Sequence, residues 1–338
     1  MTSDLEVTAR AMVAPGKGIL AIDETPGTCT KRFEELGIES TQDSRRAYRE
    51  LLLTTPGLSE YVGGAILVDE TLRATASDGR SMVDVARDAG ILPGIKVDAG
   101  ARALAGSSEE NVTEGLDRLR ERLAEYRDIG ATFTKWRAVI KIGAGMPSRQ
   151  CIEANAHALG RYAALAQEAG LVPIVEPELL MNGDHDIGRC QAATEEALRE
   201  VFSQLARQGV ALEGIVLKPN MVVPGSDGPA ANDEQVAEAT VATLRRCVPA
   251  AVPGIAFLSG GMTGEESCQR LSLMAARDHL PWHLSFSFGR ALQYPAIAIW
   301  GGQPDNVAAA QAALLHRAKM SSLARSGAYN RQLEGAAA

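Results

Sequence analysis

Short apolar segments rich in β-branched residues alternate along the chain with longer amphipathic stretches. This pattern predicts strands over residues 18–23, 63–68, 92–98, 133–142, 171–178, 214–220, 254–260 and 284–289. The stretches between them have helical spacing, as at Ala197, Val201 and Leu205. A second helical face is predicted for the series Val112, Leu116, Leu119, Leu123 and Tyr126. Gly130 and Gly170 follow two of these stretches, and glycine is common at the C-terminal end of a helix.

A strand followed by a helix, repeated eight times, predicts parallel strands joined by crossovers. At 338 residues, the fold class we expect is α/β, a single (β/α)₈ TIM barrel over residues 1–338 with a flexible C-terminal tail from about residue 327. The rival is a doubly wound open sheet. That sheet usually carries a Gly-x-Gly-x-x-Gly loop after its first strand, and the chain has no such motif.

The bulk composition argues against several classes of protein. A net charge of −8 argues against nucleic acid as a partner, because phosphate backbones need clustered positive charge. No apolar run approaches the roughly 20 residues that span a bilayer, and the N-terminus lacks the regions of a signal peptide. We therefore expect a cytoplasmic protein with no membrane partner.

Polar residues cluster where the predicted strands end, although charged groups inside a barrel are costly unless they are paired. Charges at the carboxyl ends of barrel strands are typical of an active site. The residues in this position are Asp23, Lys96, Asp98, Lys135, Arg137, Glu176, Glu178, Lys218, Asn220, Ser259, Gly260, Gly261, Ser287, Gly289 and Arg290.

Lysine is rare in this chain, and its placement is informative. There are seven lysines, and the other 27 of the 34 basic residues are arginine, yet four lysines fall within predicted strands. Arginine stays protonated and cannot form an imine, so lysine at these positions indicates amine chemistry. Ion pairing with Asp23, Glu176 and Glu178 is the alternative interpretation.

Amine chemistry needs a neutral lysine, which is scarce at pH 7. A neighbouring cation or desolvation raises the neutral fraction, and Lys218 flanked by Lys135 would be such an arrangement. Glu176 and Asp23 are the candidates to move protons. Their alternative role is charge compensation for the lysines.

Two features indicate phosphate binding. Ser259-Gly260-Gly261 closes the seventh predicted strand just before a helix start at Thr263, and backbone N–H groups of such a turn bind phosphate in these barrels. Arg290, after the eighth strand, would add a fork of donors.

Seven motifs together resemble one family, the class I (Schiff-base) fructose-bisphosphate aldolases. The resemblance runs from about Leu5 to Tyr329. The motifs are Ala-Pro-Gly-Lys-Gly-Ile-Leu-Ala-x-Asp-Glu (14–24), Gly-Ile-Lys-Val-Asp (94–98), Lys-Trp-Arg (135–137), Ile-Val-Glu-Pro-Glu (174–178), Leu-Lys-Pro-Asn-Met (217–221), Phe-Leu-Ser-Gly-Gly (257–261) and Gly-Arg-Ala-Leu-Gln (289–293).

The resemblance implies a metal-independent lyase of glycolysis and gluconeogenesis without a cofactor. It would cleave fructose 1,6-bisphosphate reversibly to dihydroxyacetone phosphate and glyceraldehyde 3-phosphate. Lys218 would form the imine, Glu176 would be the main acid and base, and Lys135 and Asp23 would assist. The resemblance also implies a homo-oligomer, a tetramer.

It implies substrate-binding residues as well. Ser259, Gly260, Gly261, Ser287, Gly289 and Arg290 would hold the phosphate on the dihydroxyacetone side. Lys96 and Arg32 would face the other phosphate, and Arg137 and Glu178 would line the site.

The chain departs from the family pattern at three places. Thr25-Pro26-Gly27-Thr28 stands where a Ser-rich turn is common, and Phe288 stands where Tyr is common. Animal members have a longer tail ending in a Tyr that helps a proton transfer, and this chain ends at Ala338 without it.

The motifs leave three other interpretations to consider. A metal-dependent aldolase needs clustered histidines, but His157, His185, His279, His283 and His316 are dispersed; five scattered cysteines without a C-x-x-C pair do not suggest zinc or disulfides either. A related Schiff-base aldolase or transaldolase would act on another sugar phosphate. A non-catalytic scaffold would leave the reactive groups unexplained.

Overall fold

The protein is described here by a computed structural model that covers residues 3–337. Within those residues, one sheet of eight parallel strands has the order β1-β2-β3-β6-β7-β8-β9-β10. These strands are β1 Gly18–Ala21, β2 Val62–Leu67, β3 Leu92–Lys96, β6 Phe133–Ile140, β7 Val172–Leu179, β8 Val216–Leu217, β9 Gly254–Phe257 and β10 His283–Phe286.

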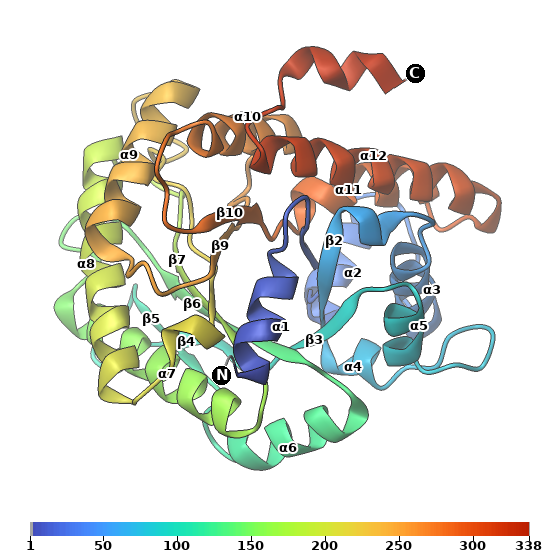
Figure 1. The fold of residues 1–338 in the computed structure, drawn as a ribbon, viewed down its shortest axis with the longest axis horizontal. Coiled ribbons are helices and arrows are strands. Elements are labelled where there is room, and N and C mark those ends of the chain that lie inside the picture. The colour runs from blue at the N-terminus through green and yellow to red at the C-terminus, as the bar shows by residue number, and fades with distance from the viewer. Residues whose placement is uncertain (1–2, 338) are drawn as a thin grey trace.

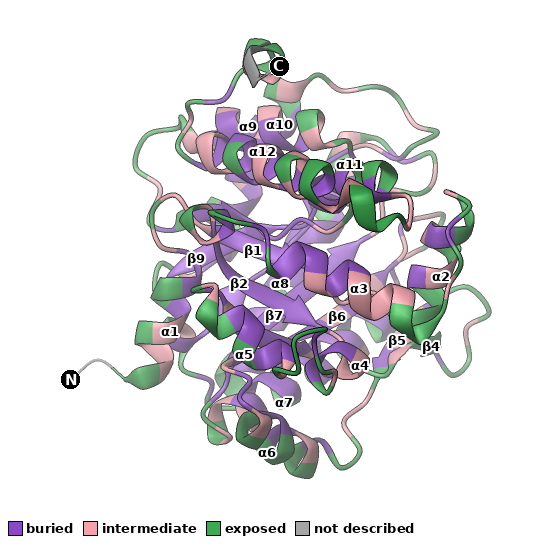
Figure 2. Cartoon of the chain, turned by 90° about the vertical axis from the view of Figure 1, so that its right-hand side faces the viewer, coloured by how far each residue is buried: buried purple, intermediate pink, exposed green. Residues whose placement is uncertain are grey.

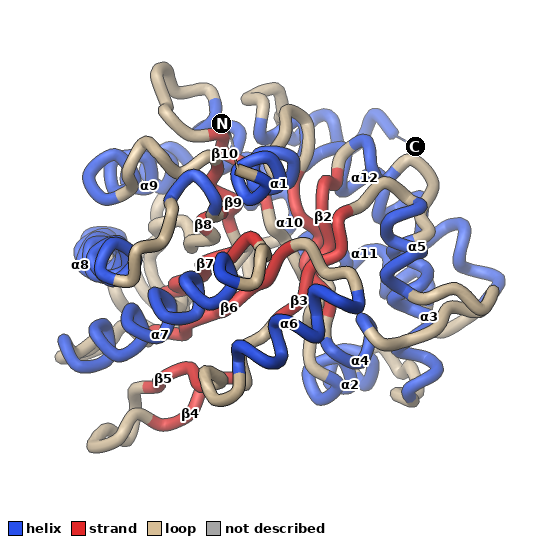
Figure 3. The backbone as a smooth tube through the Cα atoms, turned by 60° about the horizontal axis from the view of Figure 1, so that its bottom comes forward, coloured by secondary structure: helices blue, strands red, loops and turns tan. Residues whose placement is uncertain are grey.

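The first and last strands meet and close the sheet into a barrel. The Ala21 N–H at the end of β1 donates to the Phe288 carbonyl just after β10, at 3.1 Å. The strands lie at the centre of the molecule with helices around them (Figures 1 and 3). The prediction of a (β/α)₈ barrel is therefore confirmed.

Helices occupy most of the connections between strands. Their bounds are α1 Asp4–Met12, α2 Pro26–Glu34, α3 Gln42–Leu53, α4 Asp69–Leu72, α5 Met82–Asp88, α6 Leu119–Ile129, α7 Arg149–Glu168, α8 Ile187–Arg207, α9 Asp233–Cys247, α10 Gly264–Ala275, α11 Arg290–Trp300 and α12 Val307–Arg325. Short 3₁₀ helices are η1 Leu58–Glu60, η2 Leu212–Gly214, η3 Pro304–Asn306 and η4 Arg331–Ala337. Within the described chain, no helix is long and apolar enough to cross a membrane.

Side chains alternate along each strand between the barrel interior and the helical layer, because successive strand residues point to opposite faces. On β1, Ile19 and Ala21 belong to an inner cluster, and Leu20 belongs to the outer one. On β6, Phe133 lies inside and Trp136 lies outside. The same alternation carries Lys135 and Arg137 inward above Phe133, so one strand supplies both core and site.

The end of the barrel where the strands begin is filled by α1. Met12 and Val13 pack in the inner cluster with Ile19 and Phe133. The fit is close, since a Cβ added to Gly254 would lie 2.5 Å from Val13 Cγ2. Apolar packing therefore closes this end, and the opposite end is left for polar groups.

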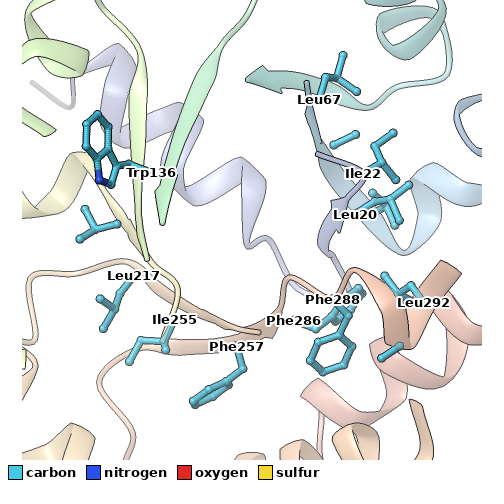
Figure 4. Packing of buried hydrophobic residues seen from close by; sticks show 14 of the residues in the cluster. Leu20, Ile22, Leu67, Trp136, Leu217, Ile255, Phe257, Phe286, Phe288 and Leu292 are labelled. Carbon is cyan, nitrogen blue, oxygen red and sulfur yellow. The ribbon is translucent and has the colours of Figure 1, made fainter. Parts of the chain in front are cut away.

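The larger core cluster lies between the strands and the helices. Its buried members include Trp136, Leu217, Ile255, Phe257 and Leu292. Figure 4 shows Trp136 on the side of Leu217 and Leu292 on the side of Phe288. Figure 2 shows the central strands buried while the helices are exposed on their outer faces. Burial of this apolar layer is the main force that holds the helices on the barrel.

One helix prediction was partly wrong. Tyr126 and Leu123 lie on α6 as expected, but Val112 lies on a strand, and Leu116 precedes the helix. Residues 100–114 form an antiparallel hairpin, β4 Gly100–Ala103 with β5 Asn111–Glu114. Gly115 follows β5 with φ 128°, a left-handed conformation that breaks helical continuity.

The C-terminal segment contacts the barrel layer. Glu334, within η4, pairs with His316 at 2.9 Å and with Arg317, and it accepts a hydrogen bond from the Tyr329 hydroxyl at 2.8 Å. The predicted flexible tail from residue 327 includes residue 338, which lies outside the described residues.

Candidate active site

A cavity of about 520 Å³ opens at the carboxyl ends of the barrel strands. Every residue to which the sequence analysis assigned a catalytic or substrate-binding role lines this cavity, whereas Asn220, also at a predicted strand end, does not. The residues with an assigned role are Asp23, Arg32, Lys96, Lys135, Arg137, Glu176, Glu178, Lys218, Ser259, Gly260, Gly261, Ser287, Gly289 and Arg290.

The strand register explains why the central side chains meet. Lys135 on β6 is the register partner of Ile174 on β7, and Arg137 is the partner of Glu176. Lys218 directly follows β8, where its N–H donates to the Val175 carbonyl at 2.8 Å. Neighbouring parallel strands thus place these inward side chains at similar heights in the barrel.

Four charged side chains form a continuous chain of ion pairs. Lys135 Nζ lies 2.6 Å from Asp23 Oδ2 and 3.1 Å from Glu176 Oε2. Lys218 Nζ lies 3.2 Å from Glu176 Oε1. The exposed fraction of these side chains is 3–4%, except for 14% at Asp23. Solvent therefore screens these pairs weakly.

Burial and the neighbouring charges act on the acids in opposite directions. Burial by itself would raise the pKa of Glu176, but the ammonium groups of Lys135 and Lys218 lower it below its ordinary value. The pKa of Asp23 is also held low, because the same two lysines outweigh the effect of burial. Both carboxylates are thus ionised at neutral pH and can accept protons.

Lys135 has the reverse balance. Burial would lower its pKa, but Asp23 and Glu176 raise it above its ordinary value. Lys135 is therefore held as a cation, and it is suited to electrostatic and proton-donating roles rather than to nucleophilic attack.

One wall of the cavity is suited to an anion. Gly260 and Gly261 have φ values of 56° and 93°, and successive N–H groups in such a turn form an anion-binding concavity. Ser287 is 1% exposed, and its hydroxyl has no hydrogen-bond partner within residues 3–337. Arg290 begins α11 and lies over the Tyr294 ring, 5.6 Å from Cζ to the centroid.

The other cations of the cavity are each held by a carboxylate. Arg137 pairs with Glu178, and Arg32 pairs with Glu24. Lys96 Nζ lies 2.5 Å from Asp98 Oδ1. These pairs fix long side chains that would otherwise be free to reorient.

Two further acidic residues, Asp98 and Glu24, line the cavity. The sequence analysis placed Asp98 at a strand end without assigning it a role, and it did not single out Glu24. Glu24 also pairs with buried Arg49 at 2.7 Å and accepts a hydrogen bond from Gln293 Nε2 at 2.8 Å. Asp98 lies two residues after Lys96 and therefore on the same face of an extended chain, which was the signal available in the sequence.

Uncharged residues line the cavity as well. Thr25 and Thr28 do so from the turn that stands where the family pattern has a Ser-rich one. Thr25 caps α2 through a hydrogen bond from the Thr28 N–H at 3.4 Å. Met181 and Asn182 also line the cavity. They were missed because they lie in the loop after β7, and nothing in their sequence spacing marks them.

Within residues 3–337, no three His, Cys, Asp or Glu side chains are placed to share a metal ion. The cysteines at 29, 151, 190, 247 and 268 are all free thiols.

The arrangement combines an amine, acids and anion sites. Lys218 can attack a carbonyl, and Glu176 at 3.2 Å can exchange protons with it. Donors on the Ser259–Gly261 and Ser287–Arg290 walls can hold a phosphate. This set is suited to imine chemistry on a phosphorylated ketone.

Comparisons with known proteins agree with this description. A family model described as fructose-bisphosphate aldolase class-I matches residues 4–338. The chain is 56% identical over 327 residues to a probable fructose-bisphosphate aldolase class 1 of Xanthomonas campestris, covering 96% of this chain and 98% of the relative. It is 49% identical over 334 residues to the chloroplastic fructose-bisphosphate aldolase 3 of Arabidopsis thaliana, covering 98% and 85%.

A solved structure has the same fold. It is fructose-bisphosphate aldolase from Plasmodium falciparum, in complex with TRAP and a small-molecule inhibitor. The TM-score is 0.95 at 45% sequence identity, covering 96% of this chain and 95% of that one.

Proposed function

Since this chain belongs to the class I fructose-bisphosphate aldolase family, we propose that it performs the family's retro-aldol cleavage through an imine on Lys218. The observation that supports this assignment is the chain of ion pairs from Asp23 through Lys135 and Glu176 to Lys218. The products are dihydroxyacetone phosphate and glyceraldehyde 3-phosphate.

The first step is imine formation. Neutral Lys218 attacks the ketose carbonyl carbon, and the carbinolamine then loses water as its oxygen is protonated. Glu176 is within 3.2 Å of the amine, so it takes the proton that the amine loses and returns one to the departing oxygen. Lys135, held as a cation, stabilises the ionised Glu176 between these transfers.

The second step is cleavage of the carbon–carbon bond. A base removes the proton from the C4 hydroxyl, the C3–C4 bond breaks, and the electron pair is taken up by the imine as an enamine. Asp23 or Glu176 is the base, with Lys135 between them at 2.6 and 3.1 Å. Protonation of the enamine and hydrolysis then free Lys218.

The two ends of the substrate are held apart. Ser259, Gly260, Gly261, Ser287, Gly289 and Arg290 bind the phosphate on the dihydroxyacetone side. Lys96 and Arg32 face the other phosphate, and Arg137 with Glu178 lines the space between. Gripping both phosphates fixes the carbonyl beside Lys218, which lowers the entropic cost of attack.

Borohydride trapping tests the proposal. The protein is reduced in the presence of dihydroxyacetone phosphate, digested and mapped by peptide mass. We expect one mass addition on the peptide containing Lys218. Lys141→Met, which changes a lysine on the rim paired with Glu109, should keep the adduct, and Lys218→Met should lose it. An adduct that persists in Lys218→Met would move the nucleophile elsewhere.

Substrate preference distinguishes the proposed function from the alternative, a related Schiff-base aldolase or transaldolase that acts on another sugar phosphate. An enzyme built for a monophosphate would cleave fructose 1-phosphate at least as well as the bisphosphate.

We further propose that the chain acts as a single barrel domain without a metal or cofactor, in the cytoplasm, in glycolysis and gluconeogenesis, and as a homotetramer.

A further inference from the structure

Lys96 and Lys135 are register partners on β3 and β6, so two ammonium groups start from adjacent positions on the barrel wall. Lys135 is drawn to Asp23 and Glu176. Lys96 is drawn the other way, to Asp98, which lies beyond the end of β3. The structure thus keeps two like charges apart by giving each its own carboxylate.

Asp98 is a buried carboxylate that the proposed chemistry does not use. Its side chain is 2% exposed. Oδ1 accepts from Lys96 Nζ at 2.5 Å and from the Gly100 N–H at 3.1 Å, and Oδ2 accepts from the Arg137 N–H at 3.1 Å. Lys96 Nζ also donates to the Asp98 carbonyl at 3.0 Å.

These contacts join three parts of the cavity wall. The Gly100 N–H begins β4, and Gly100 and Ala101 themselves line the cavity. The Arg137 N–H belongs to β6, and the side chain of the same residue pairs with Glu178. A single carboxylate therefore fixes Lys96, the start of the β4–β5 hairpin and the middle of β6 relative to one another.

The position of the Lys96 ammonium depends on Asp98. Lys96, Lys135, Arg137 and Lys218 each have a carboxylate partner among the described residues. Lys96 is the member whose only ion-pair partner there is Asp98. Without Asp98, nothing would hold its flexible four-carbon stem in this position beyond the end of β3.

We propose that Asp98 is a positioning residue that sets the preference for a bisphosphate over a monophosphate, by holding the Lys96 ammonium where the second phosphate binds. This inference rests on the proposed function of Lys96. It assigns to Asp98 the arrangement of that phosphate site and no part in bond making or breaking. Its loss should therefore alter substrate selectivity more than turnover.

The experiment compares fructose 1,6-bisphosphate with fructose 1-phosphate in Asp98→Asn, Lys96→Met and the double variant. For Asp98→Asn we expect KM for the bisphosphate to rise about tenfold while kcat changes less than threefold. The kcat/KM for fructose 1-phosphate should stay within threefold. The double variant should match Lys96→Met, because Asp98 acts through Lys96.

Asp78→Asn is a matched control. Asp78 also accepts from the backbone N–H two residues on, at 3.0 Å, and pairs with the side chain of that residue, Arg80. It lies on the surface, so its loss should leave both substrates unaffected. If Asp98→Asn proves unstable, Asp98→Glu takes its place. It keeps the charge but displaces it by one methylene, so it should also lose selectivity for the bisphosphate.

The two proposals fail differently. Lys96→Met with unchanged selectivity would refute the phosphate role of Lys96, whatever Asp98→Asn does. Equal losses on both substrates in Asp98→Asn and Asp98→Glu would show a structural role only. Effects that multiply in the double variant would show that Asp98 acts independently of Lys96. Equal losses on both substrates and multiplying effects would each overturn the inference about Asp98.

Discussion

Glu176 and Lys218 form an ion pair inside the barrel, with 3.2 Å between Oε1 and Nζ. The side chains of both are 4% exposed. The other oxygen of the carboxylate lies 3.1 Å from Lys135 Nζ, so one acid is shared by two amines. The nucleophile and the group that can take its proton are therefore already in contact before substrate arrives, which makes the roles of the individual residues testable.

Replacing Lys218 by Arg should abolish cleavage, because the charge remains but the guanidinium cannot form an imine. We expect kcat/KM to fall by roughly 10⁴-fold or more, while circular dichroism shows a folded protein. Lys141→Arg, on the rim, should be unaffected. Near-normal turnover in Lys218→Arg would contradict the assignment of the nucleophile.

Replacing Glu176 by Gln should lower kcat by about 10²- to 10⁴-fold, the usual contribution of a general acid or base. KM should change little, because the phosphate contacts remain. Steady-state kinetics measure both constants. Glu195→Gln is the control, since Glu195 is a largely buried carboxylate on α8 that pairs with Arg199 and Arg246 and does not line the cavity. A kcat that falls less than about threefold would exclude Glu176 as the main acid and base.

Chelation should leave activity intact, because imine chemistry needs no metal. The measurement is the cleavage rate before and after prolonged treatment with EDTA. Strong inhibition that zinc reverses would contradict the metal-independent mechanism.

Acid should destabilise the protein below about pH 4.5. Asp23 and Glu176 have pKa values lowered in the folded state, so their contribution to stability is present above the unfolded pKa values, about 4, and is lost as pH falls through the folded ones. The slope approaches about 1.4 kcal/mol per pH unit for each proton taken up on unfolding. Denaturant unfolding between pH 7 and pH 3 measures this, and a stability that rises towards pH 3 would contradict it.

Replacing Glu24 by Gln should destabilise the fold, because Arg49 would remain buried with its charge uncompensated. The Glu24 and Arg49 side chains are 8% and 3% exposed, and breaking such a pair costs about 3–5 kcal/mol. Glu234→Gln, which breaks an exposed pair with Arg277, should cost less than about 1 kcal/mol. Chemical denaturation compares the two, and equal costs would show that burial does not set the energy of this pair.

The barrel could be predicted largely from the sequence, because buried parallel strands give short apolar runs that stand out from amphipathic helices. The boundaries were less certain. The sixth barrel strand, predicted over 214–220, is only Val216–Leu217 in the structure, because hydrogen bonding and not composition ends a strand. The β4–β5 hairpin was missed because Val112 and Leu116 happen to have helical spacing.

The site was predictable to the extent that charge at a strand end is unusual. Lys135, Glu176 and Lys218 stood out because charged residues rarely occupy barrel strands. Glu24 did not stand out, since an acid beside another acid is ordinary in sequence. Its role depends on partners such as Gln293, which is 269 residues away along the chain.

The sequence by itself thus determined which strands form and which side chains reach the barrel interior, because both depend on local periodicity. Only the tertiary structure decided which charge pairs with which: that Glu176 lies between two lysines, and that Asp98 holds Lys96 away from Lys135. Pairing of this kind depends on distances between strands that are remote along the chain, and these are fixed only when the barrel closes.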